Sequence, residues 1–307
     1  MQGAQLHGHP GGSASVRSSW LPRAARMRSY SQSTNSAAGN RPTRGVLILP
    51  GLGNNAQDYL ALSQLLQSRG FVTATAPVQR QDWGRNAAAL TDGAWWRGKL
   101  QPRPAVDWYL NHVNTAMQEL KREVDAPITM LTHSAGGWLG RVFLRDFGTE
   151  GVDRFVSLGS PHQPPPMGGI DQTRGILTWV SQEVPGAWHD TIDYTTVTGR
   201  FIKGSALTGP GPALAKFAGA GYQQVCGSSE VWGDFIVPCV SAHLEGATQV
   251  ELDGVFHSPL GEKLAAFGPW YGSESVLPQW AWALDGSARP PVPTPTEETA
   301  PGVPASN

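Results

Sequence analysis

Short apolar runs alternate with helical patterns along most of the chain. Six segments have the composition of buried strands: 45–50, 71–78, 128–131, 155–158, 191–198 and 248–252. Between several of them apolar residues recur at the three-to-four-residue spacing of amphipathic helices, over 59–70, 106–120 and 138–147. Because strands that alternate with helices form parallel sheets, the pattern predicts an α/β fold with helices on both faces of a mostly parallel sheet of about six strands.

Two stretches interrupt the alternation. Residues 79–104 interleave tryptophan with arginine, for which we expect packing at the edge of the sheet, with a substrate-binding wall of indoles as the alternative. Residues 162–190 are rich in proline and glycine around a short apolar piece at 176–180, which predicts a lid-like insertion over the carboxyl edge of the sheet. A helix after His257 is expected to close the sheet.

The two ends differ in composition from the middle of the chain. Residues 1–44 hold six arginines, eight serines and no acidic residue, which is typical of an organellar transit peptide, and of a chloroplast rather than a mitochondrial one. A merely disordered N-terminus is the alternative. Residues 288–307 are rich in proline and predict a disordered tail. The predicted α/β domain therefore covers 45–287.

Charge and cysteine content exclude several functions. The chain of 307 residues carries a net charge of −1, and beyond residue 44 there are 17 basic against 24 acidic residues, which disfavours nucleic acid as a partner. No run of about 18 apolar residues exists, although contact with a membrane surface stays open. Cys226 and Cys239 lack metal-ligand spacing, so we expect free thiols and no metal site.

Residues 132–136, Thr-His-Ser-Ala-Gly, follow the apolar run that ends at Leu131 and precede a helical pattern. A strand, a sharp turn with serine and a helix form the nucleophile elbow of serine hydrolases, in which small residues stand two positions before and after the serine. Gly136 fits, whereas Thr132 stands where glycine is usual. We expect the turn to form nonetheless, with a strained Ser134 whose hydroxyl faces a histidine.

A serine nucleophile needs an imidazole base and a carboxylate to orient it, and in this fold class they follow in the order serine, acid, histidine. Asp234, in a loop, and His257, in a turn after the last strand, supply that order after Ser134. His243 is the alternative base. The alternative acids are Asp190, Asp193 and Asp253.

An oxyanion hole requires two backbone N–H donors. The amide of Ala135, directly after the nucleophile, is one candidate, and Leu52 or Gly53, in the loop after the first strand, supplies the other, with Leu52 preferred. His133 is expected to pack within the elbow. His162 is expected either to line the pocket or to stabilise a turn.

Five motifs carry a resemblance to a known superfamily: residues 50–55, 132–138, 158–162, 233–238 and 253–259. Together they resemble the α/β-hydrolases over residues 44–285, and more narrowly the plant and algal plastid lipase-like hydrolases, distantly related to GPI inositol-deacylases and lipases. The resemblance implies a triad of Ser134, Asp234 and His257 that acts on carboxylic esters without metal or organic cofactor. The sequence departs from the usual pattern at Thr132 and in having no room for the two strands that normally precede the first strand here.

The predicted function is a serine esterase or lipase that acts on a small-molecule or lipid ester. Two alternatives remain open. One is an inactive hydrolase fold that serves as a binding or scaffold module, and the other is an acyltransferase or thioesterase that uses the same triad.

Overall fold

A six-stranded, entirely parallel sheet forms the centre of the molecule. The computed structural model describes residues 44–166, 169, 171–260 and 267–290. The sheet order is β2-β1-β3-β4-β5-β8, and its strands are β1 (Gly45–Leu49), β2 (Val72–Thr75), β3 (Ile128–His133), β4 (Val152–Leu158), β5 (Asp193–Arg200) and β8 (Thr248–Asp253). The parallel sheet of six strands confirms the predicted fold class.

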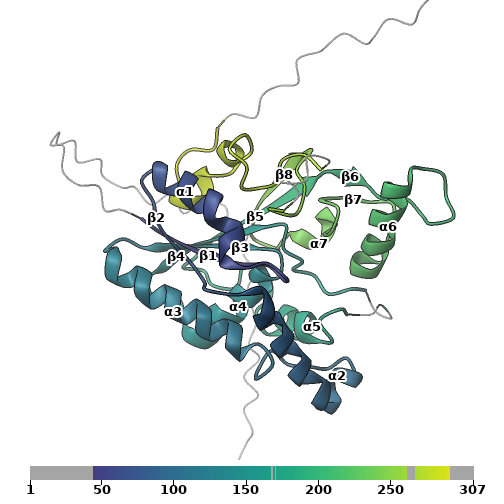
Figure 1. Cartoon of the computed structure of the whole chain (residues 1–307), viewed down its shortest axis with the longest axis horizontal. Helices are drawn as coiled ribbons and strands as arrows, with labels where there is room; N and C mark the ends of the chain where they lie inside the picture. Colours follow the sequence, from purple (N-terminus) through teal and green to yellow (C-terminus); the bar gives the residue numbers. More distant parts are fainter. Residues whose placement is uncertain (1–43, 167–168, 170, 261–266, 291–307) are drawn as a thin grey trace, which may run out of the picture. The chain divides into compact units, whose positions relative to one another are not determined.

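Side chains alternate between the two faces of the sheet, as successive residues of a strand must. In β1, Leu47 and Leu49 pack into one buried cluster, whereas Val46 and Ile48 pack into the other. The first cluster lies under α3 (Asp107–Glu123), α4 (Gly136–Phe147) and α5 (Ile176–Glu183). The second lies under α1 (Leu60–Ser68), η3 (Leu277–Gln279) and α8 (Trp282–Asp285). Helices therefore cover both faces (Figure 1).

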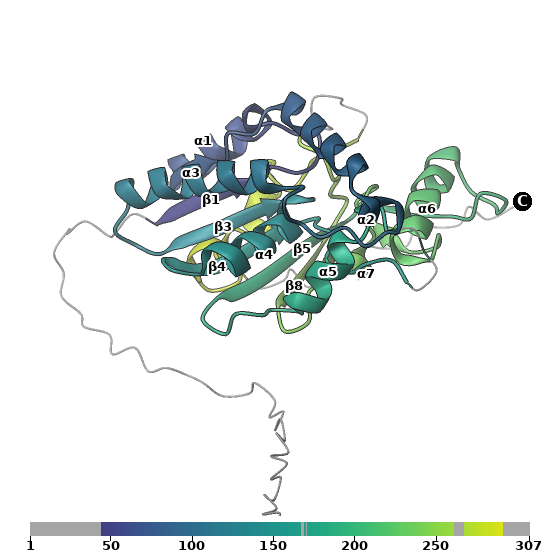
Figure 2. The same ribbon diagram turned by 90° about the horizontal axis from the view of Figure 1, so that it is seen from below.

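The remaining elements gather near one end of the sheet. They are η1 (Ala56–Tyr59), η2 (Arg80–Thr91), α2 (Gly93–Trp96), α6 (Ala213–Cys226), α7 (Cys239–Ala242) and the antiparallel pair β6 (Ile202–Lys203) and β7 (Trp232–Gly233). Figures 1 and 2 both place α2, α5 and α6 at the same end of the sheet. Because β3 ends there too, these helices surround the point where the chain turns into the elbow.

The predicted elements match the structure closely in position, with differences at their ends. The strand predicted over 71–78 spans only 72–75, and the one predicted over 155–158 begins at Val152. The helix expected after His257 falls partly on 261–266, outside the described residues. The predicted transit peptide and proline-rich tail fall almost entirely on 1–43 and 291–307, which also lie outside them. Within the described ranges no helix is both long and apolar enough to cross a membrane.

Candidate active site

Ser134 lies on a tight turn between β3 and α4. Its backbone φ is +52°, in the left-handed region that non-glycine residues rarely adopt, so the turn is strained as predicted. Gly51 allows the neighbouring loop to approach, because a Cβ there would lie 2.6 Å from the Ser134 Cβ. Gly136 is required for the same reason, since its Cβ would lie 2.5 Å from the Leu49 carbonyl oxygen. The crowding holds the serine at the end of β3.

Thr132 fits the elbow because α4 has a glycine opposite it. The Thr132 hydroxyl donates to the Val156 carbonyl at 3.3 Å, and its methyl group points toward Gly140. A Cβ on Gly140 would lie 3.2 Å from the Thr132 Cγ2. Because Gly140 has no side chain, α4 leaves room for the Thr132 methyl group on β3.

His257 lies in the turn after β8, and its ring stands between Ser134 and Asp234. Its Nε2 is 3.0 Å from the Ser134 Oγ, and its Nδ1 is 2.7 Å from the Asp234 Oδ2. A carboxylate only accepts hydrogen bonds, so the Nδ1 carries a proton and donates it to Asp234. The neutral ring then presents its Nε2 lone pair to the Ser134 hydroxyl, which is the geometry in which an imidazole can take the proton of a serine.

Asp234 is fully buried directly after β7, and four donors satisfy its carboxylate. The backbone amides of Ile236 and Val237 donate to its Oδ1 at 3.0 and 2.7 Å. Its Oδ2 accepts from His257 and from the Tyr271 hydroxyl, the latter at 2.7 Å. These four bonds compensate the burial of the negative charge. Sequence reasoning missed Tyr271, for which no local motif exists.

Two backbone amides close to Ser134 are free to bind an oxyanion. Within the described part of the chain, neither the Ala135 amide nor the Leu52 amide donates to a protein acceptor. The amide of Gly51 is already used, because it donates to the Tyr59 hydroxyl at 2.9 Å. The amides of Leu52 and Ala135, which are the expected oxyanion donors, are thus both without a protein acceptor. The amide of Gly53 is the alternative to that of Leu52.

Neither of the other two conspicuous histidines is placed to act on Ser134. His133 is buried, and its Nε2 contacts the His257 carbonyl oxygen at 2.8 Å. His162 is also buried and bonds the Ser157 hydroxyl through its Nε2 at 2.9 Å. Burial disfavours the charged ring and lowers the pKa of both groups well below the ordinary value, so both rings are neutral. His162 is also not among the residues that line the cavity described below.

The alternative base and acids lie elsewhere. The His243 Nδ1 bonds the Thr196 hydroxyl at 2.8 Å, with its other nitrogen facing Glu251. Asp193 pairs with Arg154 and Asp253 with Arg200. These partners account for the side chains without reference to Ser134.

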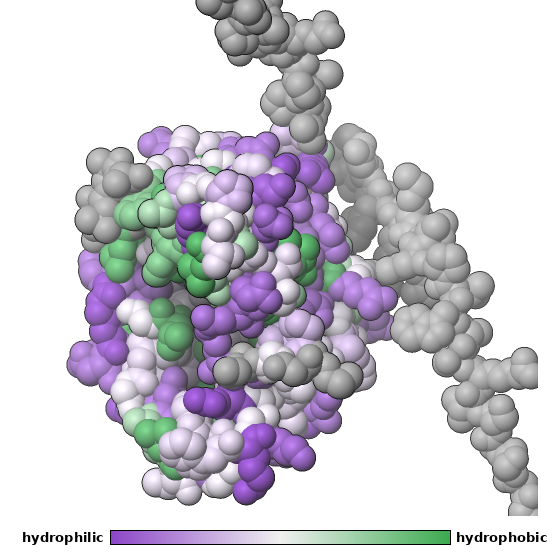
Figure 3. Space-filling view, turned by 90° about the vertical axis from the view of Figure 1, so that its right-hand side faces the viewer, coloured by the Kyte–Doolittle hydropathy of each residue, from purple (hydrophilic) through white to green (hydrophobic). Residues whose placement is uncertain are grey.

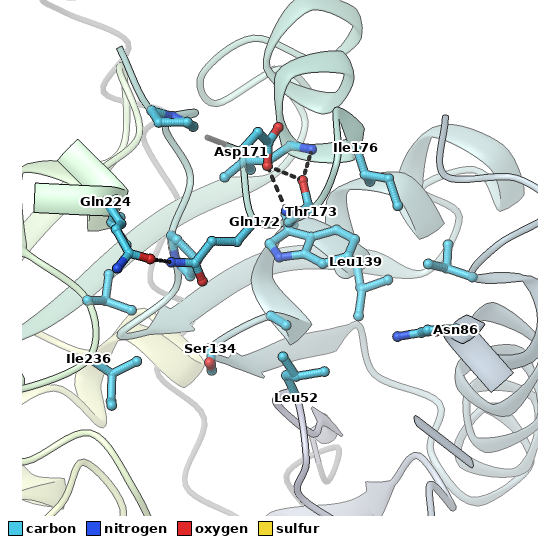
Figure 4. A pocket seen from close by; sticks show the side chains of 18 of the residues that line it. Leu52, Asn86, Ser134, Leu139, Asp171, Gln172, Thr173, Ile176, Gln224 and Ile236 are labelled. Carbon is cyan, nitrogen blue, oxygen red and sulfur yellow. Dashed lines mark hydrogen bonds between the residues drawn. The ribbon is translucent and has the colours of Figure 1, made fainter. Parts of the chain in front are cut away.

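A cavity of about 560 Å³ opens above Ser134, and its lining is mainly apolar. The lining comes from six regions of the chain: the loop after β1, η2 with α2, the start of α3, the elbow with the start of α4, α5 with the preceding loop, and α6 with the loop after β7. Figure 3 looks onto this end of the molecule, where apolar side chains border a hollow. In Figure 4, Ser134 lies between Leu52 and Ile236 at the base of the cavity.

The segment over 79–104 does more than pack at the edge of the sheet. Trp83 and Trp95 pack against the buried cluster and also line the cavity. The expectation of packing alone is therefore incomplete, and the alternative of an indole wall describes the structure better. Helix α6, which sequence reasoning missed, supplies the facing wall through Phe217 and Val225.

The polar groups of the cavity are few and mostly paired. The Gln172 amide donates to the Gln224 side chain at 3.3 Å across the roof, and Asp171 accepts from Thr173 (Figure 4). Asn86 accepts from the Trp108 indole N–H at 2.9 Å through its Oδ1, which leaves its amide nitrogen facing the cavity. A ligand of this cavity is thus surrounded by hydrocarbon with isolated amides.

No protein-family model matches the sequence, and no curated protein matches it. Among solved structures, a lipase from Bacillus licheniformis in its mature form is similar, with 15% identity and a TM-score of 0.43 over 73% of this chain and 88% of that one. A metagenome-derived lipolytic enzyme matches with 15% identity and a TM-score of 0.37, over 52% and 73%. A pyrethroid hydrolase from Sphingobium faniae matches with 20% identity and a TM-score of 0.26, over 40% and 42%. These values are too low to transfer a substrate or a residue role.

Proposed function

We propose that the protein is a serine hydrolase that cleaves carboxylic esters. The observation that carries the proposal is the row of hydrogen bonds from the Ser134 Oγ through the His257 ring to Asp234, at the base of an apolar cavity. A hydroxyl bonded to an imidazole that is itself bonded to a carboxylate is the arrangement that activates serine as a nucleophile. Catalytic roles for these three residues are thus part of the proposal.

The proposed reaction has two halves. In the first, the Ser134 Oγ attacks the ester carbonyl carbon while the His257 Nε2 takes the hydroxyl proton. The amides of Leu52 and Ala135 bind the resulting oxyanion, and His257 then returns the proton to the leaving alcohol. In the second half, His257 deprotonates a water that attacks the acyl-enzyme. His257 then gives this proton to the departing Ser134 Oγ, which releases the carboxylic acid and restores the serine hydroxyl. Asp234 holds the Nδ1 proton of His257 throughout.

The cavity favours an ester with a large apolar group. Its volume of about 560 Å³ lies in the range of sites for drug-sized ligands, and aromatic side chains of η2, α3 and α6 form part of its walls. Since the described residues of those walls include no cation that could bind a phosphate or carboxylate, we expect neutral esters with apolar acyl or alcohol groups to be the best substrates.

A lipid surface is the proposed source of such esters. Leu52, Phe217 and Ile236 line the cavity, yet 47 to 67% of each residue is exposed, and Leu214 lies one turn before Phe217 on α6. Replacing Leu214 and Phe217 by serine should lower hydrolysis of emulsified esters more than hydrolysis of dissolved ones. Leu60→Ser, on an exposed position of α1, is the control.

Reaction with a fluorophosphonate tests the nucleophile directly. The wild-type protein should be labelled and should hydrolyse p-nitrophenyl esters, whereas Ser134→Ala should lose labelling and about 10³-fold or more of kcat. Ser68→Ala, exposed on α1, should behave as the wild type. Equal labelling of the wild type and Ser134→Ala would refute the proposal, and an unlabelled, inactive wild type would favour a binding module.

The same assay separates the possible acceptors and leaving groups. Esters of increasing acyl length, their thioesters, and esters with added alcohol acceptors are compared under one set of conditions. The highest kcat/KM on oxygen esters without an acceptor supports ester hydrolysis. A higher value on thioesters, or transfer to the alcohol, would replace the proposal by thioesterase or acyltransferase activity.

We also propose that the protein acts in a chloroplast, on the composition of residues 1–44 alone. A fusion of these residues to a fluorescent protein should be imported by isolated chloroplasts and shortened during import. Import into mitochondria instead would contradict this location.

A further inference from the structure

Two buried tyrosines bind the same peptide group in the loop after β1. The Tyr109 hydroxyl donates to the Pro50 carbonyl oxygen at 2.7 Å, and the Gly51 amide donates to the Tyr59 hydroxyl at 2.9 Å. The Pro50 carbonyl and the Gly51 amide are the two polar atoms of one planar peptide group. Tyr59 and Tyr109 are both fully buried, and they belong to the two opposite clusters of the core. The peptide is therefore fixed from both sides.

The next peptide group is fixed as well. The Gly51 carbonyl oxygen accepts from the Asn54 amide at 3.1 Å, which closes the turn. In a trans peptide the N–H points away from the preceding C=O, so this bond sets the direction of the Leu52 N–H. The loop cannot rotate that N–H without breaking the turn or the bonds to the tyrosines. The oxyanion donor is thereby oriented before any substrate binds.

The Tyr59 hydroxyl also extends this arrangement to the base. Because it accepts from Gly51, its own proton goes to the His133 Nδ1, which lies 2.7 Å away. His133 then carries its ring proton on Nε2 and donates it to the His257 carbonyl oxygen at 2.8 Å. Burial keeps His133 neutral, since it lowers the pKa of the ring well below its ordinary value. One chain of hydrogen bonds thus joins the oxyanion loop, the elbow and the base.

We propose that Tyr59 and Tyr109 are positioning residues that pre-form the oxyanion hole, and that Tyr59 also holds the base in register with it through His133. This inference rests on the proposed ester hydrolysis. Stabilising donors that are already oriented need no rearrangement as charge develops, which is the largest single source of rate enhancement in many enzymes. The tyrosines touch neither the oxyanion nor the nucleophile, and they act through the Leu52 amide and His257.

Tyr59→Phe and Tyr109→Phe remove the two hydroxyls and keep the rings that fill the core. Loss of one oxyanion donor typically lowers kcat about 10²- to 10³-fold, so a donor that is misoriented most of the time should lower it roughly 10- to 100-fold. KM for a small ester should change little, because the cavity keeps its shape. The two losses should not be additive in the double variant, since both bonds hold one peptide.

A trifluoromethyl ketone separates positioning from a purely structural role. It adds to Ser134 as a tetrahedral oxyanion, so its Ki reports on the hole. In both Phe variants Ki should rise by the factor by which kcat/KM falls. Tyr194→Phe, a buried tyrosine of β5, is the control for a lost hydroxyl in the core and should change neither value. His133→Gln, which interrupts the chain at a different residue, should lower kcat with little change of KM.

The outcomes distinguish this inference from the function on which it rests. Phe variants that are folded by near-ultraviolet circular dichroism and keep their affinity for the ketone would overturn the positioning role while ester hydrolysis stands. A rise in Ki that Tyr194→Phe shares would overturn it too, because the effect would then belong to core packing in general. A wild-type protein that neither hydrolyses esters nor reacts with a fluorophosphonate would instead refute the proposed function.

Discussion

Gly140→Ala tests why the elbow tolerates Thr132. The added methyl would lie 2.9 Å from the Phe155 Cε2, 3.2 Å from the Thr132 Cγ2 and 3.3 Å from the Leu49 Cδ2, all closer than ordinary contact. These neighbours lie in the centre of the sheet and are fully buried, so they cannot move aside into solvent. Crowding of this kind costs about 1–3 kcal/mol, whereas alanine in place of glycine favours a helix by about 1 kcal/mol.

The net expectation for Gly140→Ala is a loss of up to about 2 kcal/mol of unfolding free energy. Gly221→Ala is the matched control, because Gly221 also lies within a helix, α6, but a Cβ there would meet no heavy atom within 4 Å. That variant should be more stable than the wild type by about 1 kcal/mol, the helix-propensity gain alone. Urea unfolding at one pH and temperature gives both values by linear extrapolation.

Thr132→Ser isolates the contact between strand and helix. Serine lacks the Cγ2 but keeps the hydroxyl that donates to Val156, so it removes one of the three close approaches. Gly140→Ala should therefore cost less in the Thr132→Ser background, by about 0.5 kcal/mol or more of coupling. Equal costs in both backgrounds, or a Gly140→Ala variant as stable as Gly221→Ala, would refute the idea that the missing helix side chain accommodates the threonine.

Three further expectations concern buried and cavity-facing groups. Burial lowers the pKa of His133 and His162, whereas the unfolded rings titrate near 6.5. Below about pH 6.5 the unfolded chain therefore binds more protons than the folded one. The unfolding free energy should then decrease as the pH is lowered, by about 1.4 kcal/mol per pH unit for each ring. His162→Gln should reduce that slope in urea titrations, and an unchanged slope would contradict this. Asn86→Asp keeps the acceptor for the Trp108 indole but places a carboxylate oxygen toward the cavity, so kcat/KM for apolar esters should fall at least about tenfold while fluorophosphonate labelling persists. Retained kcat/KM would show that no substrate group reaches Asn86. Burial raises the pKa of the Cys239 thiol to about 11, so a disulfide reagent at pH 8 should modify it only at the rate of unfolding.

The sheet could be predicted from the sequence because each strand has a recognisable local pattern of residues. Residues 45–49 and 128–132 are completely buried and consist of apolar or β-branched residues without interruption. Glycines end the neighbouring helices, as Gly148 does for α4, where φ is +86°. Six strands and their parallel arrangement follow from such signals. The order in which the strands pair depends on contacts between distant residues and was not predicted.

The elements that form the cavity walls could not be predicted from such local patterns. In α6, Leu214 and Phe217 are exposed and Phe217 faces the cavity, so its apolar residues do not form the buried stripe that marks a core helix. In η2, Trp83 faces both the core and the cavity, and composition alone cannot separate the two environments. Elements that line a cavity do not pack against another element along their whole length. They therefore lack the regular spacing of buried apolar residues that marks a core helix.

Some residues of the site could likewise be identified from the sequence, and others could not. Ser134 and His257 could be chosen from the sequence because each follows a strand of the parallel sheet, and the carboxyl ends of parallel strands meet at one edge. Asp234, in a loop, could be chosen only from its place in the order serine, acid, histidine. Tyr59, Tyr109 and their bonds to the Pro50–Gly51 peptide could not, since a buried tyrosine has no local signature of the carbonyl or amide that it binds. Topology brings the proposed reacting groups to one edge, whereas bonds between distant residues set their orientation. A sequence motif therefore marks the proposed nucleophile, and we propose that the rate it can reach depends on residues that no motif contains.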